Sequence, residues 1–386
     1  MIQKTAGVIG RMFRRGGFHR FFPLIALLGV MTGCETGAPS GRPASQRSSA
    51  QLETLPIPQA PTLQAARDPV EPAPPAQPTP PIQTAPAVVE SPAAASPGSA
   101  NASGESRGPY WVDWQQWREA HGNRKIEVIP GSKRVLWEGT PVYLGFEPRL
   151  IDHRVEVLRR DIEKTFTPLL ESGRVVPALR RIVIDPGHGG TNSGTRIITG
   201  SQFEKQFTLD WALRLAALLQ ARGWDVSLTR TNDASLDLPG RIESADRAGA
   251  ALFVSLHFNG AFPNTEVRGL ETYCLTPKGL PSTVTRDFAD DASQEWPNNA
   301  FDNPNLRLAL RIHRSLIQKT GAVDRGVRRA RFMGVLRGQK RPAILIEGGF
   351  LSNPAEASQI ATAAYRQRLA EAVASALDEP EHADRR

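Results

Sequence analysis

The feature that most constrains the fold is a set of short apolar runs in the second half of the chain. RRIVIDP (180–186), ALFVSLH (251–257) and PAILIEGGF (342–350) each contain three or more consecutive apolar residues. Such runs are typical of strands that are buried on both faces of a sheet. Between them, FTLDWALRLAALLQARG (207–223) has apolar residues at helical spacing and ends near a glycine. The alternation predicts a single α/β domain over 175–378, with a mostly parallel sheet covered on both sides.

Further elements fit the same domain. DVSLTR (225–230) and RGLETYCL (268–275) are predicted strands, and YRQRLAEAVASAL (365–377) is a predicted final helix. Another helix is expected from Asn305, since leucine and isoleucine side chains recur there on one face. The residues before it, 281–304, are polar and rich in proline and asparagine, which predicts a long loop.

The residues before the α/β domain differ in composition. Segment 109–174 contains a predicted helix and short alternating strands broken by Pro-Gly and Glu-Gly turns, which indicates a small α+β module. Segment 35–108 is rich in Pro, Ala and Ser, so ordering it would cost backbone entropy with little apolar burial in return. We therefore expect a disordered linker there, and a disordered tail over 379–386.

The N-terminus, residues 1–34, has the pattern of an export signal. Basic residues precede an apolar run over 21–33, which is shorter than the roughly 20 residues that span a bilayer. The run ends in Met-Thr-Gly-Cys, which resembles the bacterial lipoprotein signal and implies lipidation of Cys34. A plain signal peptide or an uncleaved anchor is the alternative. Cys274 would then be unpaired, so no intramolecular disulfide is expected.

These features predict a protein anchored by lipid on the periplasmic side of the cell envelope. Glu35 after the cysteine favours the outer membrane. The formal net charge of +8 is compatible with attraction to an anionic envelope polymer. Nucleic acid is not an expected partner of an exported chain.

Four residues able to do chemistry lie where the fold predicts a ligand site. In open α/β sheets, ligands bind beyond the carboxyl ends of the strands. His188, His257 and Glu347 lie at the ends of three predicted strands, and Glu204 lies at the start of the first helix. Two imidazoles and one carboxylate form the ligand set of a catalytic zinc site, and zinc activates water near neutral pH. The spacing alone is not diagnostic, because each histidine could equally be structural.

The surrounding residues carry a family resemblance over 181–376. Four blocks resemble, in order, the motifs of the zinc-dependent N-acetylmuramoyl-L-alanine amidases: IVIDPGHGG, FEKQFTLDWALRLAALL, SLTRTNDASLDLPGRIESADRAGAALFVSLHFNG and ILIEGGFLSNPAE. The resemblance implies Zn²⁺ held by His188, Glu204 and His257, with Glu347 as the general acid and base. It also implies hydrolysis of the amide between N-acetylmuramic acid and the L-alanine of peptidoglycan stem peptides.

Other residues near these motifs have two interpretations each. Asn259 and Arg230 are predicted substrate contacts, with a turn cap and a structural ion pair as their respective alternatives. Arg241 is expected to form a structural ion pair, with a contact to a stem-peptide carboxylate as the alternative. Asp185 either orients a ligand or caps a turn. Three residues depart from the family pattern, and none of them is expected to touch a proposed ligand: Asn192, Gln206 and Phe258.

The small module also carries a resemblance. VYLGFEPRLIDHRVEV and DIEKTFTPLL are similar to the module named for copper amine oxidase N-terminal domains, which precedes the catalytic domain in some cell-wall amidases. No metal role follows for His121 or His153, which are expected at the surface. In some relatives an inserted helix blocks the metal until an activator protein binds. We expect loop 281–304 to border the groove, with self-inhibition as the alternative.

Peptidoglycan, a membrane and an activator protein are thus the expected partners. Two competing functions stay open on the residues alone. One is a degenerate amidase fold that binds cell wall without cleaving it, and the other is a zinc peptidase that cuts stem-peptide bonds. The presence of all four residues, His188, Glu204, His257 and Glu347, argues against degeneracy.

Overall fold

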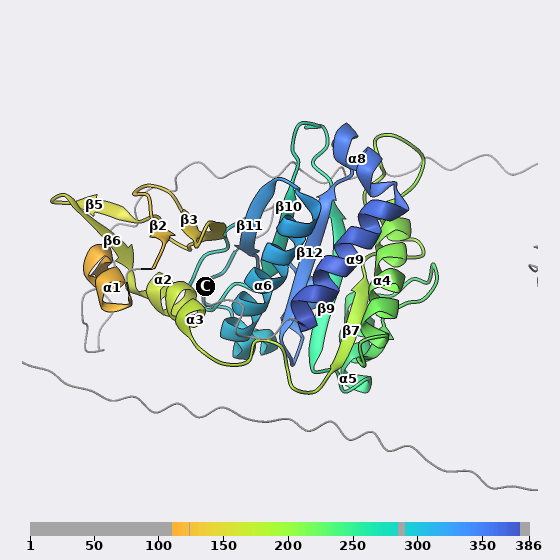
Figure 1. Ribbon diagram of the computed structural model, residues 1–386, viewed down its shortest axis with the longest axis horizontal. Helices are drawn as coiled ribbons and strands as arrows, with labels where there is room; N and C mark the ends of the chain where they lie inside the picture. Colours follow the sequence, from red (N-terminus) through yellow and green to blue (C-terminus); the bar gives the residue numbers. More distant parts are fainter. Residues whose placement is uncertain (1–109, 123, 285–289, 379–386) are drawn as a thin grey trace, which may run out of the picture. The chain divides into compact units, whose positions relative to one another are not determined.

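The computed structural model describes residues 110–122, 124–284 and 290–378, which fall in one compact unit (Figure 1). The predicted signal, Cys34, the predicted linker and the predicted tail lie outside the described residues. None of the helices within the described ranges is long and apolar enough to cross a membrane.

A nine-stranded sheet forms the centre of the fold, in the order β2-β3-β4-β11-β10-β12-β9-β7-β8. Strands β8, β7, β9 and β12 run parallel, β10 is antiparallel to β12, and β11 and β4 run parallel to β10. This confirms the predicted α/β class with a mostly parallel sheet. The strands of the predicted catalytic domain are β7 (Arg181–Pro186), β8 (Asp225–Leu228), β9 (Leu252–Asn259), β10 (Leu270–Cys274), β11 (Asp324–Arg329) and β12 (Ala343–Phe350).

Helices cover both faces of the sheet (Figure 1). Along β7, Ile182 and Ile184 belong to one buried cluster and Val183 to another, as the alternation of side chains across a strand requires. The first cluster includes residues of α4 (Glu204–Gln220), α6 (Asp302–Thr320) and α9 (Ala363–Asp378). The second includes residues of α5 (Leu238–Arg247) and α7 (Gly334–Arg337), and α8 (Pro354–Ile360) contacts β12.

Local chemistry explains where two of these helices begin and end. Helix α4 begins at Glu204, three residues before the predicted apolar stretch, because the Gln206 side chain accepts a hydrogen bond from the backbone N–H of Phe203 at 2.9 Å. Helix α6 ends at Gly321, whose φ of 66° gives the left-handed C-terminal turn that glycine favours. In β10, Cys274 is free and buried, as expected for a small apolar residue, and burial raises the pKa of its thiol to about 11.

The N-terminal segment is continuous with the catalytic sheet. Strands β2 (Ile126–Glu127), β3 (Arg134–Trp137) and β4 (Thr140–Tyr143) form its edge, and β4 pairs with β11 in parallel. The predicted boundary near residue 174 therefore separates two segments that share one sheet. The rest of the segment is a three-stranded antiparallel sheet with short helices: β1 (Trp111–Asp113), α1 (Trp114–Ala120), β5 (Arg149–Ile151), β6 (Arg154–Leu158), α2 (Arg159–Asp161), the π-helical turn η1 (Ile162–Phe166) and α3 (Thr167–Leu170).

Candidate metal centre

Three side chains from separate segments converge at one edge of the sheet. His188 follows β7, Glu204 is the first residue of α4, and His257 lies near the end of β9. Each offers one ligand atom, and these atoms lie within 4.8 Å of one another. Within the described ranges, no other group of three His, Cys, Asp or Glu side chains comes together in this way.

The backbone around His188 lets the side chains of His257 and Glu204 come close to it. His188 itself has a φ of 63°, a left-handed conformation that is uncommon for a residue with a side chain. A Cβ atom at Gly187 would lie 2.3 Å from Cε1 of His257, and one at Gly194 would lie 2.6 Å from Oε2 of Glu204. Both positions therefore need glycine, because the metal-binding side chains occupy the space that a larger residue would take.

Glu204 is the centre of the cluster. Its Oε1 lies 3.0 Å from Nε2 of His188 and 3.0 Å from Nδ1 of His257, and it accepts the backbone N–H of Phe258 at 3.0 Å. Its Oε2 accepts the backbone N–H of Thr195 at 3.0 Å. Burial alone would raise the pKa of Glu204, but the two neighbouring histidines, His188 more than His257, outweigh it and lower the pKa. The carboxylate is therefore ionised at neutral pH.

The two histidines differ in their surroundings. Burial lowers the pKa of His257, which favours the neutral imidazole that binds metals. Burial acts in the same direction on His188, but the charge of Glu204 outweighs it and raises the pKa of His188. Nδ1 of His188 lies 2.8 Å from Oδ1 of Asn192. Asn192 thus touches a proposed ligand, contrary to the expectation that the departures from the family pattern do not.

This set of donors fits a zinc ion. Two imidazole nitrogens and one carboxylate oxygen are available within a few ångströms, as in catalytic zinc sites. A buried, ionised carboxylate between two imidazoles also supplies negative charge that a cation would neutralise. The contact of Asn192 with the other ring nitrogen of His188 is the kind that orients a metal-binding histidine.

A buried ion pair supports the turn that carries His188. Asp185 accepts hydrogen bonds at 2.6 Å from Arg241, Ser255 and Thr229. Arg241 also donates to the carbonyl oxygen of His188 at 2.7 Å. Burial alone would raise the pKa of Asp185, but Arg241 and the two hydroxyl groups outweigh it and lower the pKa. Arg241 therefore has the structural role expected for it, and Asp185 fixes the turn.

We expect Asp185→Ala to reduce the free energy of unfolding at pH 7 by about 3–5 kcal/mol, because it leaves Arg241 buried without its partner. Urea unfolding measures the change. Asp225→Ala is the matched control, since it removes an exposed ion pair with Arg181 and should have little effect. The lowered pKa of Asp185 means that its contribution is present at neutral pH and lost in acid. The difference in the free energy of unfolding between wild type and variant should therefore become smaller as the pH falls below about 4. A difference that does not change with pH would contradict the ion-pair account.

The two predicted substrate contacts are directed into the protein. Arg230 is 4% exposed and donates to the carbonyl oxygens of Pro186, Gly187 and Lys205 at 2.8–3.0 Å. Asn259 is also buried, and its Nδ2 donates to Oε2 of Glu271 at 3.2 Å. The contacts of Arg230 hold the His188 loop against α4, as in the structural alternative given for it, and its contact with substrate stays a prediction. The contact of Asn259 is likewise internal.

Strand pairing places Glu347 beside the cluster. Glu347 lies in β12, opposite His257 of the parallel neighbour β9 and opposite Glu271 of the antiparallel neighbour β10. Residues that face each other across a ladder point to the same side of the sheet. His257, Glu347 and Glu271 therefore form a row on one face of the sheet. The candidate ligand His257 is at one end of this row.

Glu271 is the member of this row that sequence reasoning missed. Its Oε1 lies 2.6 Å from Nε of Arg325 and 3.1 Å from Nε of Arg328, and its Oε2 accepts from the Tyr273 hydroxyl at 2.6 Å. Burial alone would raise the pKa of Glu271, but Arg328 and Arg325 outweigh it and lower the pKa. No sequence signal marks Glu271, because only the antiparallel pairing of β10 brings it beside Glu347.

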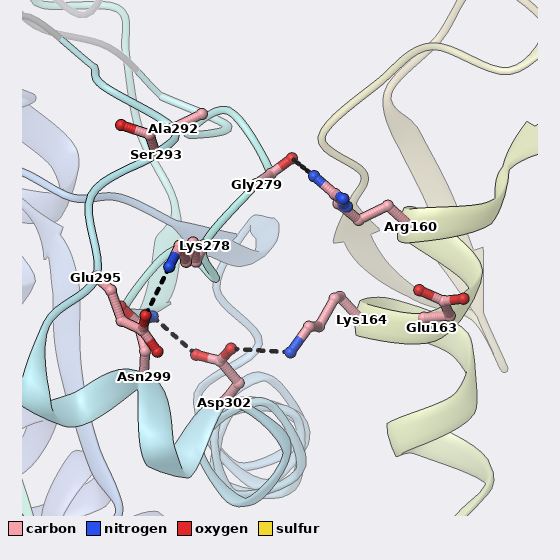
Figure 2. A pocket seen from close by; sticks show the side chains of 10 residues that line it. All are labelled: Arg160, Glu163, Lys164, Lys278, Gly279, Ala292, Ser293, Glu295, Asn299 and Asp302. Atoms are coloured by element: carbon pink, nitrogen blue, oxygen red, sulfur yellow. Dashed lines mark hydrogen bonds and ion pairs between the residues drawn. The ribbon is translucent and has the colours of Figure 1, made fainter. Parts of the chain in front are cut away.

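A separate hollow of about 660 Å³ lies between the N-terminal helices and the segment around loop 281–304 (Figure 2). Lys164 faces Asp302 across it at 3.4 Å, and Arg160 donates to the carbonyl oxygen of Gly279 at 3.3 Å. Within the predicted loop 281–304, Pro297–Phe301 form the 3-10 helix η2, and α6 begins at Asp302 rather than at Asn305. The described residues of this segment hydrogen-bond to β11 and to the segments that flank it, as in Thr283 to Arg329 and Asn298 to Arg341. In those residues no hydrogen bond runs to the candidate ligands, so the expectation that the loop borders their groove has no contact to support it.

The chain is similar to known amidases over the α/β part. The N-acetylmuramoyl-L-alanine amidase family model matches residues 182–379. Amidase AmiA of Salmonella typhimurium is 30% identical over 219 residues, which cover 51% of this chain and 75% of AmiA. Amidase LytC of Bacillus subtilis is 34% identical over 192 residues, which cover 50% of this chain and 34% of LytC.

Solved amidase structures are also similar to this chain. The catalytic domain of CwlV from Bacillus (Paenibacillus) polymyxa var. colistinus is 30% identical, with 51% of this chain and 95% of that chain covered and a TM-score of 0.42. The CwlD amidase of Clostridioides difficile, solved in complex with the GerS lipoprotein, is 26% identical, with 51% and 95% covered and a TM-score of 0.42.

Proposed function

The chain belongs to the N-acetylmuramoyl-L-alanine amidase family, and on that premise we propose that His188, Glu204 and His257 hold a catalytic zinc ion while Glu347 transfers protons. The protein is an amidase that acts on peptidoglycan, at the bond between N-acetylmuramic acid and L-alanine. The observation that carries the proposal is the meeting of the three ligand atoms at the strand ends, with Glu347 in register with His257.

Each residue has a distinct part in the proposed mechanism. Zinc, when bound, supplies a Lewis acid that lowers the pKa of water towards ~7 and polarises the scissile carbonyl group. Glu347 accepts the proton of the attacking water and donates it to the nitrogen of L-alanine as the C–N bond breaks. Asn192 orients the ring of His188, and the Asp185–Arg241 pair keeps the turn in place. The products are a free lactyl carboxylate and a peptide with a free N-terminal L-alanine.

The products of digestion test this function against its competitors. Purified peptidoglycan is incubated with the zinc-loaded protein, and the soluble products are identified by mass spectrometry and N-terminal labelling. The proposal predicts stem peptides that begin with a free L-alanine. Cleavage within the stem would instead favour a zinc peptidase, and zinc uptake without any released product would favour a binding protein.

The domain organisation and location complete the proposal. We propose an exported protein, lipidated at Cys34, on the periplasmic side of the envelope, with the outer membrane favoured. A linker over 35–108 would let the enzyme reach the cell wall, and 379–386 would be a tail. The segment 109–174 would be a module similar to the amine oxidase N-terminal domain, whose strands extend the catalytic sheet over 175–378. For this protein we propose an activator protein as a partner. The complex of the CwlD amidase with the GerS lipoprotein is a precedent for a protein partner.

We expect Cys34→Ser to release the protein from membranes, because the thiol that would carry the lipid is lost while the rest of the signal is kept. Fractionation of cells that express either form measures the change. Cys274→Ser is the matched control, since that cysteine is buried in β10 and should not affect membrane retention. Unchanged retention of the Cys34→Ser protein would count against the lipid anchor and in favour of an uncleaved apolar segment.

A further inference from the structure

Arg325 is a partly exposed arginine close to the candidate catalytic centre. It is the second residue of β11, and its side chain is 22% exposed. The other arginines near the site are more deeply buried: the side chains of Arg241 and Arg328 are each 6% exposed. Arg325 therefore differs from its neighbours in being open to solvent.

Arg325 is linked to Glu347 through one intervening residue, Glu271. Glu271 lies opposite Glu347 in the ladder between β10 and β12, and Nε of Arg325 donates to Oε1 of Glu271 at 2.6 Å. The guanidinium of Arg325 also lies over the ring of Phe350, 5.3 Å from its centroid. A carboxylate at one edge and an aromatic ring at one face hold the planar group in a fixed orientation.

Part of the guanidinium remains available to a ligand. An arginine side chain has five N–H donors. Among the residues that the structure describes, the Nε donor has a partner in Glu271, and no hydrogen bond runs from either terminal nitrogen of Arg325 to another described residue. The two terminal nitrogens are the pair that binds a carboxylate through parallel hydrogen bonds.

The local charges leave this position cationic. Glu271 is shared between Arg325 and Arg328, so one carboxylate faces two guanidinium groups. Glu356 is another carboxylate within reach of the Arg325 charge, but its oxygens accept the backbone N–H groups of Gly269 and Phe350. An anionic ligand would therefore meet attraction at Arg325.

We propose that Arg325 binds a free carboxylate of the stem peptide and thereby selects acidic stems, a role that rests on the proposed function. Peptidoglycan stems carry free carboxyl groups in some cell walls and amidated ones in others. Arg325, whose terminal nitrogens bond to no residue that the structure describes and whose partner Glu271 faces Glu347, distinguishes these two chemistries. The sequence suggested Arg230 for such a contact, but the structure points to Arg325.

Two matched substrates test the assignment. One is an N-acetylmuramoyl tetrapeptide with free carboxyl groups, and the other is the same compound with those groups converted to amides. We expect the zinc-loaded wild type to show a kcat/KM roughly tenfold to a hundredfold higher for the acid, as for a charge-assisted hydrogen bond. Arg325→Gln should bring the ratio close to one. Arg325→Lys should keep part of the preference, because the charge remains but the two-pronged geometry is lost.

The ratio within one variant does not depend on how much of that variant is folded, so a loss of stability does not mimic the effect. Arg181→Gln is the control, since it also removes a positive charge. Arg181 lies at the start of β7, at the end of the strand away from His188, and its Nε pairs with Asp225. It should leave the ratio unchanged. Cleavage of both substrates without a preference in the wild type, or a preference that survives Arg325→Gln, would overturn the assignment while the amidase function stands. Failure of the wild type to cleave either substrate would remove the proposed function and this role together.

Discussion

Glu204→Gln should abolish both zinc binding and amidase activity while the fold remains. Oε1 of Glu204 faces both histidines, so replacement of the carboxylate by an amide removes the negative charge on which the cluster is centred. The loss should exceed the roughly 10–100-fold that removal of an outer hydrogen-bond partner of a metal ligand costs. Zinc content after dialysis and initial rates of peptidoglycan release measure the two effects.

Asp210→Asn is the matched control for this variant. It makes the same acid-to-amide change on the same helix, α4, at a residue whose partners are Arg214 and Arg366. Its zinc content and rate should stay close to those of the wild type. An active Glu204→Gln protein with a full complement of zinc would show that Glu204 is not a ligand.

Glu347→Gln should separate catalysis from metal binding. Because we assign Glu347 to proton transfer, its replacement should lower kcat by roughly 10²–10⁴-fold, the usual contribution of a general acid or base. Zinc content should stay at the wild-type level, since the three proposed ligands are intact. The two measurements are made on the same preparation.

The pair of results distinguishes the roles of the two glutamates. Loss of zinc in Glu347→Gln would mean that this residue is itself a ligand. A rate close to that of the wild type would mean that another group transfers the proton. Either outcome would require a different assignment of the row that His257 and Glu347 form across β9 and β12.

The sequence was sufficient to predict the part of the fold that carries the metal cluster. The cores of β7, β9 and β12 are consecutive apolar residues, because both faces of these strands are covered by helices. Parallel strands in one sheet end at the same edge, so His188 and His257 could be placed together without knowledge of the loops. The position of Glu204 needed only the start of the following helix.

Strand β11 is an element that sequence reasoning missed, because most of its residues are polar or charged. Strand β11 reads DRGVRR, yet Arg328 and Arg329 are buried in it. The Arg329 guanidinium donates to the Thr165 hydroxyl at 2.9 Å, and the Arg328 guanidinium to that of Tyr143 at 3.0 Å. These hydrogen-bond partners lie far away in the sequence. A hydrophobicity pattern therefore cannot predict that such charged side chains are buried.

The other features that the sequence could not predict depend on contacts between segments that are far apart in the chain. No local pattern indicates that β4 pairs with β11, so the sequence does not show that the two predicted segments share one sheet. The burial of Arg230 and the partial exposure of Arg325 could not be predicted from the sequence for the same reason. Whether a guanidinium is covered by carbonyl groups or open to solvent depends on contacts between segments, and those contacts are set by the assembled sheet.

The most direct test of the account is to locate zinc by anomalous scattering at its absorption edge in crystals of the zinc-loaded protein. The account predicts one strong peak, about 2.0–2.2 Å from imidazole nitrogens of His188 and His257 and from a carboxylate oxygen of Glu204. Glu347 should lie outside the set of ligands. Zinc held by other residues in a protein that is still active, with no peak between these three side chains, would contradict it.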